Sequence, residues 1–163
     1  MRLESRAVDP KVQQVVDAGA AAGLTIDPRT FTTETRTAED AARNVGCEVG
    51  QIVKSLVFGS EHGPLLFLVS GANKLDTKKG AAAAGVTKLE RVDANAAKAA
   101  TGYSIGATPP LGLAGALDVF MDEDLITHDV VWAAAGRPDS VFPVEPRELA
   151  RAAAATVVDL KTE

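Results

Sequence analysis

The spacing of hydrophobic residues changes along the chain, and each change predicts a different element. Near the N-terminus the apolar residues recur at steps of three and four, which predicts an amphipathic helix over residues 10–23. Further helices are predicted over residues 37–46, 74–85 and 93–102, each of which ends at a glycine. A last helix starts at Glu145, has Pro146 in its first turn and runs into a terminal strand.

Apolar runs of strand length lie between these helices. Two of them, residues 52–59 and 64–71, are separated by the turn SEHG and predict a β-hairpin in the core. Because helices and strands alternate throughout, with no repeat and no linker, we expect a single mixed α/β domain over residues 1–163. The remaining strands are predicted over residues 25–35, around 88–92, over 116–125 and over 129–136.

The composition narrows the chemistry. The 163 residues include one cysteine, Cys47, and two histidines, His62 and His128. This excludes an internal disulfide and disfavours a zinc hydrolase, so we expect neither a metal nor a cofactor. The first residues lack an apolar leader and the apolar runs are short, so we expect a cytoplasmic protein with no membrane partner.

The charge is unevenly distributed. The net charge of −5 argues against nonspecific binding to nucleic acid. Residues 74–98, however, contain six lysines and arginines against three acidic residues, so this segment carries a charge of +3. One interpretation is a solvated helix face, and the other is a local patch that binds one end of a polyanion.

Lys54 is the most informative single residue, because it interrupts a run that is otherwise typical of a buried strand. Alternation places it on the same face as Ile52, Leu56 and Phe58. A cation beside large apolar groups is costly unless it is paired or faces a wet cavity. Protection of a strand edge, or extension of the side chain to solvent, is one interpretation. The other is a pocket lysine that binds a phosphate or a carbonyl oxygen.

The segment GYSIGATPPLG, residues 102–112, contains glycines and prolines that interrupt both helix and strand. It has no Cys, His, Asp or Glu, and its only side-chain hydroxyls belong to Tyr103, Ser104 and Thr108. Its glycine spacing does not fit a phosphate-binding loop. Such a segment is either a turn or a shaped backbone surface. With the lone lysine and the basic stretch, it is consistent with a pocket for a small molecule or a nucleotide end.

These three features, in this order, resemble the YbaK/ProX family of aminoacyl-tRNA deacylases, which includes the editing domain inserted in bacterial prolyl-tRNA synthetases. TAEDAARNVGCEVGQIVKSLVF is similar to the family's lead-in, with Lys54 at the position of its essential lysine. GYSIGATPPLG is similar to the family's loop GYxxGGxSPxG, except that Ala107 and Pro109 replace its second glycine and its serine. The resemblance implies a mixed, partly barrel-like β-sheet flanked by helices.

The same resemblance implies hydrolysis of the ester that joins a wrong amino acid to the 3′ end of a tRNA. In the family the lysine anchors the phosphate of the terminal adenosine, the loop amides bind the carbonyl region, and water or a substrate group attacks. The expected substrate is tRNA for proline that carries a small amino acid such as cysteine or alanine. Prolyl-tRNA synthetase is an expected partner. The alternative is a non-catalytic module of the same fold that binds a tRNA end or a synthetase.

The resemblance also implies a set of site residues. The catalytic positions are Lys54, Gly106 and Ala107. The implied tRNA-binding residues are Lys74, Lys78 and Lys79. The implied substrate-binding residues are Ser55, Thr108, Pro110, Gly112, Ala134 and Gly136. The sequence leaves the oligomeric state open.

Overall fold

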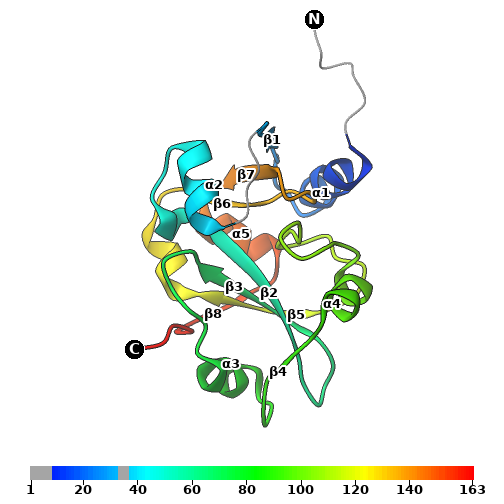
Figure 1. Cartoon of the computed structure of the whole chain (residues 1–163), viewed down its shortest axis with the longest axis vertical. Helices are drawn as coiled ribbons and strands as arrows, with labels where there is room; N and C mark the ends of the chain where they lie inside the picture. The colour runs from blue at the N-terminus through cyan, green and yellow to red at the C-terminus, as the bar shows by residue number, and fades with distance from the viewer. Residues whose placement is uncertain (1–8, 33–36) are drawn as a thin grey trace, which may run out of the picture.

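The computed structural model describes residues 9–32 and 37–163, which form two β-sheets surrounded by helices (Figure 1). Two short 3-10 helices, η2 (Val49–Gln51) and η3 (Glu123–Thr127), precede β2 and follow β5 respectively. The α-helices of the described residues are α1 (Pro10–Ala21), α2 (Ala38–Val45), α3 (Thr77–Ala84), α4 (Ala94–Thr101) and α5 (Pro146–Ala152).

The larger sheet has the strand order β4-β2-β3-β5-β8. Strands β2 and β3 form the predicted antiparallel hairpin, whereas β3 pairs with β5, and β5 with β8, in parallel. The sheet is therefore mixed, as expected. Its strands are β2 (Val53–Gly59), β3 (Leu65–Ser70), β4 (Glu90–Arg91), β5 (Asp118–Asp122) and β8 (Thr156–Val158).

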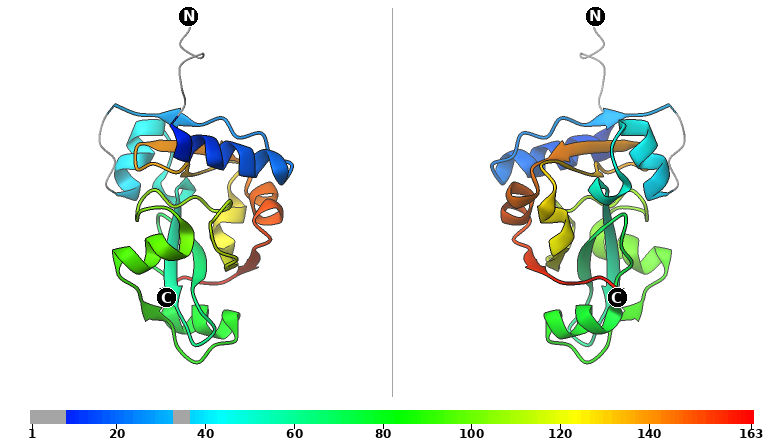
Figure 2. Two further views of the ribbon diagram at one scale, coloured as in Figure 1. Left: turned by 90° about the vertical axis from the view of Figure 1, so that its right-hand side faces the viewer. Right: turned by 90° about the vertical axis from the view of Figure 1, so that its left-hand side faces the viewer.

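The smaller sheet is antiparallel and has the order β1-β7-β6, formed by β1 (Arg29–Thr30), β7 (Ser140–Val144) and β6 (Val131–Ala134). A single parallel bridge between Ile52 and Trp132 joins its edge to the start of β2. In both views of Figure 2 the smaller sheet and α1 lie at one end of the molecule, and β4 and α3 lie at the other. The described strands form two sheets and not a closed barrel.

Local signals in the sequence explain where the helices begin and end. Helix α4 begins after Asp93, whose carboxylate accepts a hydrogen bond from the Ala96 amide, and ends at Gly102 in the left-handed region. Asp76 and Gly85 bound α3 in the same way, and Thr37 and Gly46 bound α2. These boundaries agree closely with the predicted ones.

Strand β3 is the centre of the core, because all of its residues are buried. Side chains on its two faces join different hydrophobic clusters: Leu66 and Leu68 pack with Phe142, whereas Phe67 packs with Phe120. The Phe67 and Phe120 rings are stacked with their centroids 5.4 Å apart. A strand that is buried on both faces reads as a continuous apolar run, which is why the hairpin was predictable.

The sequence-based prediction missed β7 and misplaced two strand boundaries. Strand β7 contains Pro143, which argues against a strand, but β1 pairs only with Ser140 and Val141 and so does not extend to the proline. The predicted strand over residues 116–125 ends at Asp122, whose side chain caps η3. The predicted strand 25–35 is reduced to β1, and its residues 33–36 lie outside the described part of the chain.

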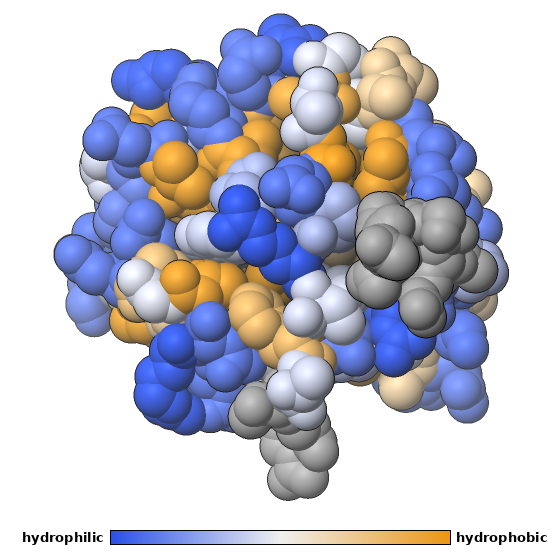
Figure 3. Space-filling view, turned by 90° about the horizontal axis from the view of Figure 1, so that it is seen from above, coloured by the Kyte–Doolittle hydropathy of each residue, from blue (hydrophilic) through white to orange (hydrophobic). Residues whose placement is uncertain are grey.

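None of the helices in the described residues is long and apolar enough to cross a membrane. Figure 3 shows the end of the molecule that carries the smaller sheet. The coloured side chains there form small apolar patches that are separated by hydrophilic groups. Within the described chain, the large hydrophobic residues that remain exposed are Ile105, Val130 and Val157.

Candidate active site

Two cavities meet at the middle of strand β2. The first cavity has a volume of about 330 Å³ and lies between β2, α2, the smaller sheet and the loop 102–112. The second cavity has a volume of about 720 Å³ and lies between β2, β4, the segment around Leu75 and the same loop. Both volumes fall in the range of small-ligand pockets. The residues that line both cavities are Lys54, Ser55, Leu56, Ile105 and Thr108.

Lys54 therefore stands at the wall that the two cavities share, rather than at a protected strand edge. Its ammonium group donates a hydrogen bond to the backbone carbonyl of Asn73. Burial lowers the pKa of Lys54, while the negative charges of Glu39 and Asp122 act in the opposite direction. The residue is a partly desolvated cation with a fixed position, which suits the binding of an anionic or carbonyl oxygen.

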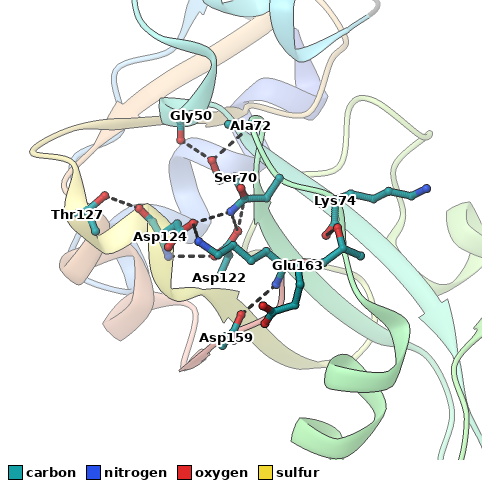
Figure 4. Close-up of polar contacts among 12 residues, drawn as sticks. Gly50, Ser70, Ala72, Lys74, Asp122, Asp124, Thr127, Asp159 and Glu163 are labelled. Carbon is teal, nitrogen blue, oxygen red and sulfur yellow. Dashed lines mark hydrogen bonds and ion pairs between the residues drawn. The ribbon is translucent and has the colours of Figure 1, made fainter.

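A buried carboxylate fixes the carbonyl to which Lys54 is bound. Asp122 is 0% exposed, and its Oδ2 accepts hydrogen bonds from the Ser70 amide (3.1 Å) and from Asn73 Nδ2 (2.8 Å). Its Oδ1 accepts a third from the Asp124 amide at 2.9 Å. The Asn73 amide group also donates to Asp124 Oδ2 at 2.9 Å. Ser70, Asp122 and Asp124 of this network are labelled in Figure 4. The loop after β3 is thus tied to the end of β5 directly behind Lys54.

Helix α1 holds the loop 102–112 from the opposite side. Lys11 Nζ donates to the Gly102 carbonyl at 2.7 Å and lies 5.0 Å from the centroid of the Tyr103 ring. The Tyr103 hydroxyl donates to Gln14 Oε1 at 3.2 Å, and the ring is buried, which raises the pKa of its phenol. The aromatic residue of the loop is therefore an anchor, not a reactive group.

Internal hydrogen bonds fix the centre of the loop. The Ala107 amide donates to the Ser104 carbonyl at 3.0 Å, and the Gly136 amide donates to the Ala107 carbonyl at 3.1 Å. Thr108 Oγ1 donates to the Ser104 carbonyl at 3.2 Å. Gly106 lines the first cavity with φ +87°, a conformation that favours glycine, and a Cβ at this position would meet nothing within 4 Å. Its backbone is therefore open to a ligand.

Four of the implied catalytic and substrate-binding residues line neither cavity. Ala107 is buried, and its amide is already hydrogen-bonded within the loop. Pro110 is buried as well. Gly112 lies against α1, where a Cβ would come within 2.6 Å of Ala18 Cβ. At Gly136 a Cβ would lie 2.7 Å from the Lys11 carbonyl oxygen. Gly112 and Gly136 thus permit close packing of their segments against α1. The contact of these four residues with a substrate stays a prediction.

The other implied catalytic and substrate-binding residues come together around the first cavity: Lys54, Ser55, Gly106, Thr108 and Ala134. Ser55 Oγ is buried and has no hydrogen-bond partner among the described residues. A buried hydroxyl without a partner is unusual in a folded protein, because its desolvation is not compensated. This atom suits a hydrogen bond to a ligand in either cavity.

The first cavity has further walls that were not identified from the sequence. Apolar groups come from Ile52, Ala41 and Trp132, and the buried Ser140 adds a hydroxyl that shares a 2.9 Å hydrogen bond with Thr30 Oγ1. The Arg29 guanidinium lies 5.2 Å from the centroid of the Trp132 ring. Trp132 and Ala134 are two residues apart in β6 and therefore lie on the same face of the strand. This spacing was the available signal in the sequence.

The three lysines expected to bind tRNA have different surroundings. Lys74 lines the second cavity, whereas Lys78 is exposed and lines neither. Lys79 Nζ forms ion pairs with Asp159 (2.8 Å) and Glu163 (3.1 Å), which raise its pKa. The residues labelled in Figure 4 include both of these acidic partners. The positive charge of Lys79 is therefore compensated within the protein.

The described residues contain no group of three or more His, Cys, Asp or Glu side chains that could hold a metal ion. The Cys47 thiol donates to the Glu48 carbonyl at 3.3 Å, and burial raises its pKa. A thiol with a raised pKa is a poor nucleophile. The site thus offers a cation, a backbone surface and hydroxyl groups.

Comparisons with known proteins agree with this description. The family model of the aminoacyl-tRNA editing domain matches residues 32–152. The uncharacterized protein YwhH of Bacillus subtilis is 33% identical over 124 residues, covering 76% of this chain and 78% of its own. EbsC of Enterococcus faecalis, named as a candidate Cys-tRNA(Pro)/Cys-tRNA(Cys) deacylase, is 30% identical over 113 residues and 69% of each chain. The crystal structure of a candidate trans-editing enzyme for prolyl-tRNA synthetase is 40% identical, with a TM-score of 0.91 over 96% of this chain and 100% of that one.

Proposed function

Because the chain belongs to the aminoacyl-tRNA editing domain family, we propose that it is a trans-editing hydrolase that deacylates mischarged aminoacyl-tRNA. The observation that carries this proposal is the position of Lys54 between two cavities, opposite an ordered loop that presents backbone. The ester of an aminoacyl-tRNA has an aminoacyl group on one side and a ribose on the other. A site with one cavity on each side of Lys54 suits such a molecule. More specifically, we propose that the substrate is tRNA for proline that carries cysteine or alanine.

Hydrolysis of this ester requires no protein nucleophile. Water, or water oriented by a neighbouring ribose hydroxyl, attacks the carbonyl carbon, the bond from that carbon to the ribose oxygen breaks, and the ribose oxygen leaves with a proton. In this proposal the carbonyl region is bound by the backbone at Gly106 and by the Ser55 hydroxyl, which both border the first cavity. A fixed donor for the developing oxyanion is worth on the order of 10²–10³ in rate. Lys54 holds the phosphate of the terminal nucleotide.

The walls of the first cavity support a small acyl group. Its apolar surface is contributed by Ile52, Ala41, Ala134 and Trp132, and it has no carboxylate among its described lining residues. A cavity of this kind discriminates mainly by size, so it admits any amino acid that is small enough. The name of EbsC, a candidate deacylase of Cys-tRNA(Pro), supports the same class of substrate.

A deacylation panel tests the proposal. We expect the protein to release cysteine or alanine from tRNA for proline, and to leave correctly charged prolyl-tRNA intact. The Lys54→Ala variant should lose the activity, whereas Lys88→Ala, which removes an exposed lysine outside both cavities, should retain it. Intact ester on every mischarged tRNA would refute the proposal, as would full activity of Lys54→Ala.

A second candidate function is a non-catalytic module that binds a tRNA end or prolyl-tRNA synthetase. The bound Ala107 amide favours it, because this residue replaces the family's second glycine and its N–H points to Ser104 instead of a ligand. The same panel separates the two functions. Binding of uncharged tRNA without any turnover would support the module, and turnover would exclude it.

A further inference from the structure

We propose that the second cavity binds the single-stranded 3′-terminal nucleotides of the RNA, with Lys74 and Arg91 as its phosphate-binding residues. This inference rests on the proposed function and adds the direction from which the substrate enters. The acyl group occupies the first cavity, the ester lies beside Lys54, and the RNA strand continues through the second cavity. The ligand class is a single-stranded oligoribonucleotide.

The charges around the second cavity are the first argument. Its described lining includes three cations, Lys54, Lys74 and Arg91, and no carboxylate. This is unusual in a chain whose net charge is −5. A concave site with one sign of charge concentrates ligands of the opposite sign. The second cavity therefore attracts an anionic ligand, although the protein as a whole is negatively charged.

These cations also differ from other cations of the same surface in being uncompensated. Lys79 pairs with Asp159 and Glu163, and Lys161 pairs with Asp124. Among residues 9–32 and 37–163, neither Lys74 nor Arg91 forms an ion pair. Within the basic stretch, Lys79 thus pairs with the C-terminal segment, whereas Lys74 and Arg91 remain available to a ligand.

The walls of the second cavity are the next argument. They are apolar over a large part of their surface, with contributions from Leu56, Phe58, Leu89 and Val92. Single-stranded nucleic acid is bound where a cationic groove follows the backbone and apolar or aromatic side chains cover the bases. Arg91 lies directly opposite Phe58 in the pairing of β4 with β2, so a cation and an apolar ring occur at one position. A nucleotide matches this combination of charge and apolar surface better than a free phosphate does.

The shared wall gives the direction of the strand. Ile105 borders both cavities and is 64% exposed, the most exposed of the large hydrophobic residues described. An apolar side chain in this position can cover the terminal ribose and base once a substrate is bound. The second cavity has about twice the volume of the first, 720 Å³ against 330 Å³, so it suits the larger part of the substrate.

Binding of short RNAs tests the inference without requiring hydrolysis. Adenosine, the dinucleotide CA and the trinucleotide CCA, all uncharged, are titrated into the full chain, and chemical shifts of the backbone amides are followed. We expect affinity to rise from adenosine to CCA, with shifts at residues around Lys74 and Arg91. Lys74→Ala and Arg91→Ala should each weaken CCA binding about tenfold. Each should also reduce the slope of the logarithm of the binding constant against the logarithm of the salt concentration by about one.

Lys88→Ala is the matched control, because it removes an exposed lysine of the same basic stretch that does not line the cavity. It should bind CCA as the wild type does. Both test residues are exposed, so their substitution leaves the core unchanged, and equal melting temperatures confirm this. Wild-type affinity in Lys74→Ala and Arg91→Ala would overturn the inference, as would an equal loss in Lys88→Ala, which would show nonspecific attraction.

Kinetics separate a failure of this inference from a failure of the proposed function. With mischarged tRNA, the two cavity variants should raise KM about tenfold and leave kcat close to the wild-type value. Hydrolysis that is unaffected by either substitution would refute RNA binding in the second cavity but leave the proposed deacylase activity standing. CCA binding that depends on both residues, in a protein that hydrolyses no ester, would refute the deacylase activity but support RNA binding in the second cavity.

Discussion

The two sides of the candidate site are built by different means. On one side Lys54 presents a charge, and the buried Asp122 fixes it through Asn73. On the other side the loop 102–112 presents backbone, and packing against α1 fixes it. A buried charge requires a polar network behind it, whereas a backbone surface requires only close contact and suitable glycines. This explains how a loop without Cys, His, Asp or Glu can be held in place by its contacts alone.

Lys54→Ala gives the largest expected effect and removes the charged side of the comparison. We expect kcat/KM for mischarged tRNA to fall by about 10- to 10²-fold, since a hydrogen bond to a charged group is worth ~1.5–3 kcal/mol. Stability should be unchanged or slightly increased, because burial disfavours the lysine cation. Steady-state kinetics and urea unfolding measure the two quantities. A variant that loses activity only because it unfolds would contradict this assignment.

Gly112→Ala acts on the packed side of the comparison. The new Cβ would lie 2.6 Å from Ala18 Cβ, and φ at this position is +74°. Overpacking costs ~1–3 kcal/mol and the left-handed backbone a further ~1 kcal/mol, so we expect a clear loss in the free energy of unfolding. Gly106→Ala is the matched control. It carries a similar backbone cost at φ +87° but meets no neighbour, so its loss should be ~1 kcal/mol.

Asp122→Asn tests the network behind Lys54 while it preserves the shape of the side chain. The carboxylate accepts three hydrogen bonds, and an amide nitrogen in place of one oxygen would face a donor. We expect a loss of about 2 kcal/mol in unfolding free energy and a lower kcat, because the Asn73 carbonyl that holds Lys54 is no longer fixed. Asp129→Asn, at an exposed position, is the control and should change neither. Unaltered kcat in a folded Asp122→Asn protein would show that Lys54 does not depend on this network.

The pH dependence of the reaction reports on Lys54 directly. Burial lowers the pKa of Lys54, so the cation is lost at a lower pH than that of an exposed lysine. After subtraction of the uncatalysed rate, we expect kcat/KM to be constant below this lowered pKa and to fall as pH rises through it. Lys54→Arg, which stays charged, should lose this decline. The free energy of unfolding should change in the opposite direction. It should rise as the pH increases from this lowered pKa to the pKa of an exposed lysine, because neutralisation of Lys54 removes the cost of a buried charge.

Tyr103→Phe gives the smallest expected effect. The hydroxyl donates one hydrogen bond to Gln14, and the ring stays buried against α1. We expect a loss of ~0.5–1.5 kcal/mol in unfolding free energy and an unchanged kcat. A large fall in kcat without a loss of stability would show that the hydroxyl acts in the reaction and is not an anchor.

Much of the fold was predictable because its signals are local. The caps Thr37 and Asp93 and the apolar run of β3 each specify an element without reference to the rest of the chain. Strand β7 was missed because its proline is tolerated only owing to the short partner β1, and the pairing partner of a strand is not visible in its own sequence.

The candidate site shows the same division. The positions of Lys54 and Gly106 followed from the pattern and the family resemblance, and both line the first cavity. The close contacts of Gly112 and Gly136 with α1 were not predicted, because α1 is far away in the sequence. Asp122 gave no signal as a support for Lys54, since the contact passes through Asn73 and depends on the order of the strands.

The most direct test of the central claim is single-turnover hydrolysis of tRNA for proline charged with alanine, with cysteine and with proline. A protein of the proposed function clears alanine or cysteine from the tRNA at a rate well above the uncatalysed one and leaves proline attached. Equal, uncatalysed decay of all three esters in the presence of the wild-type protein would contradict the claim.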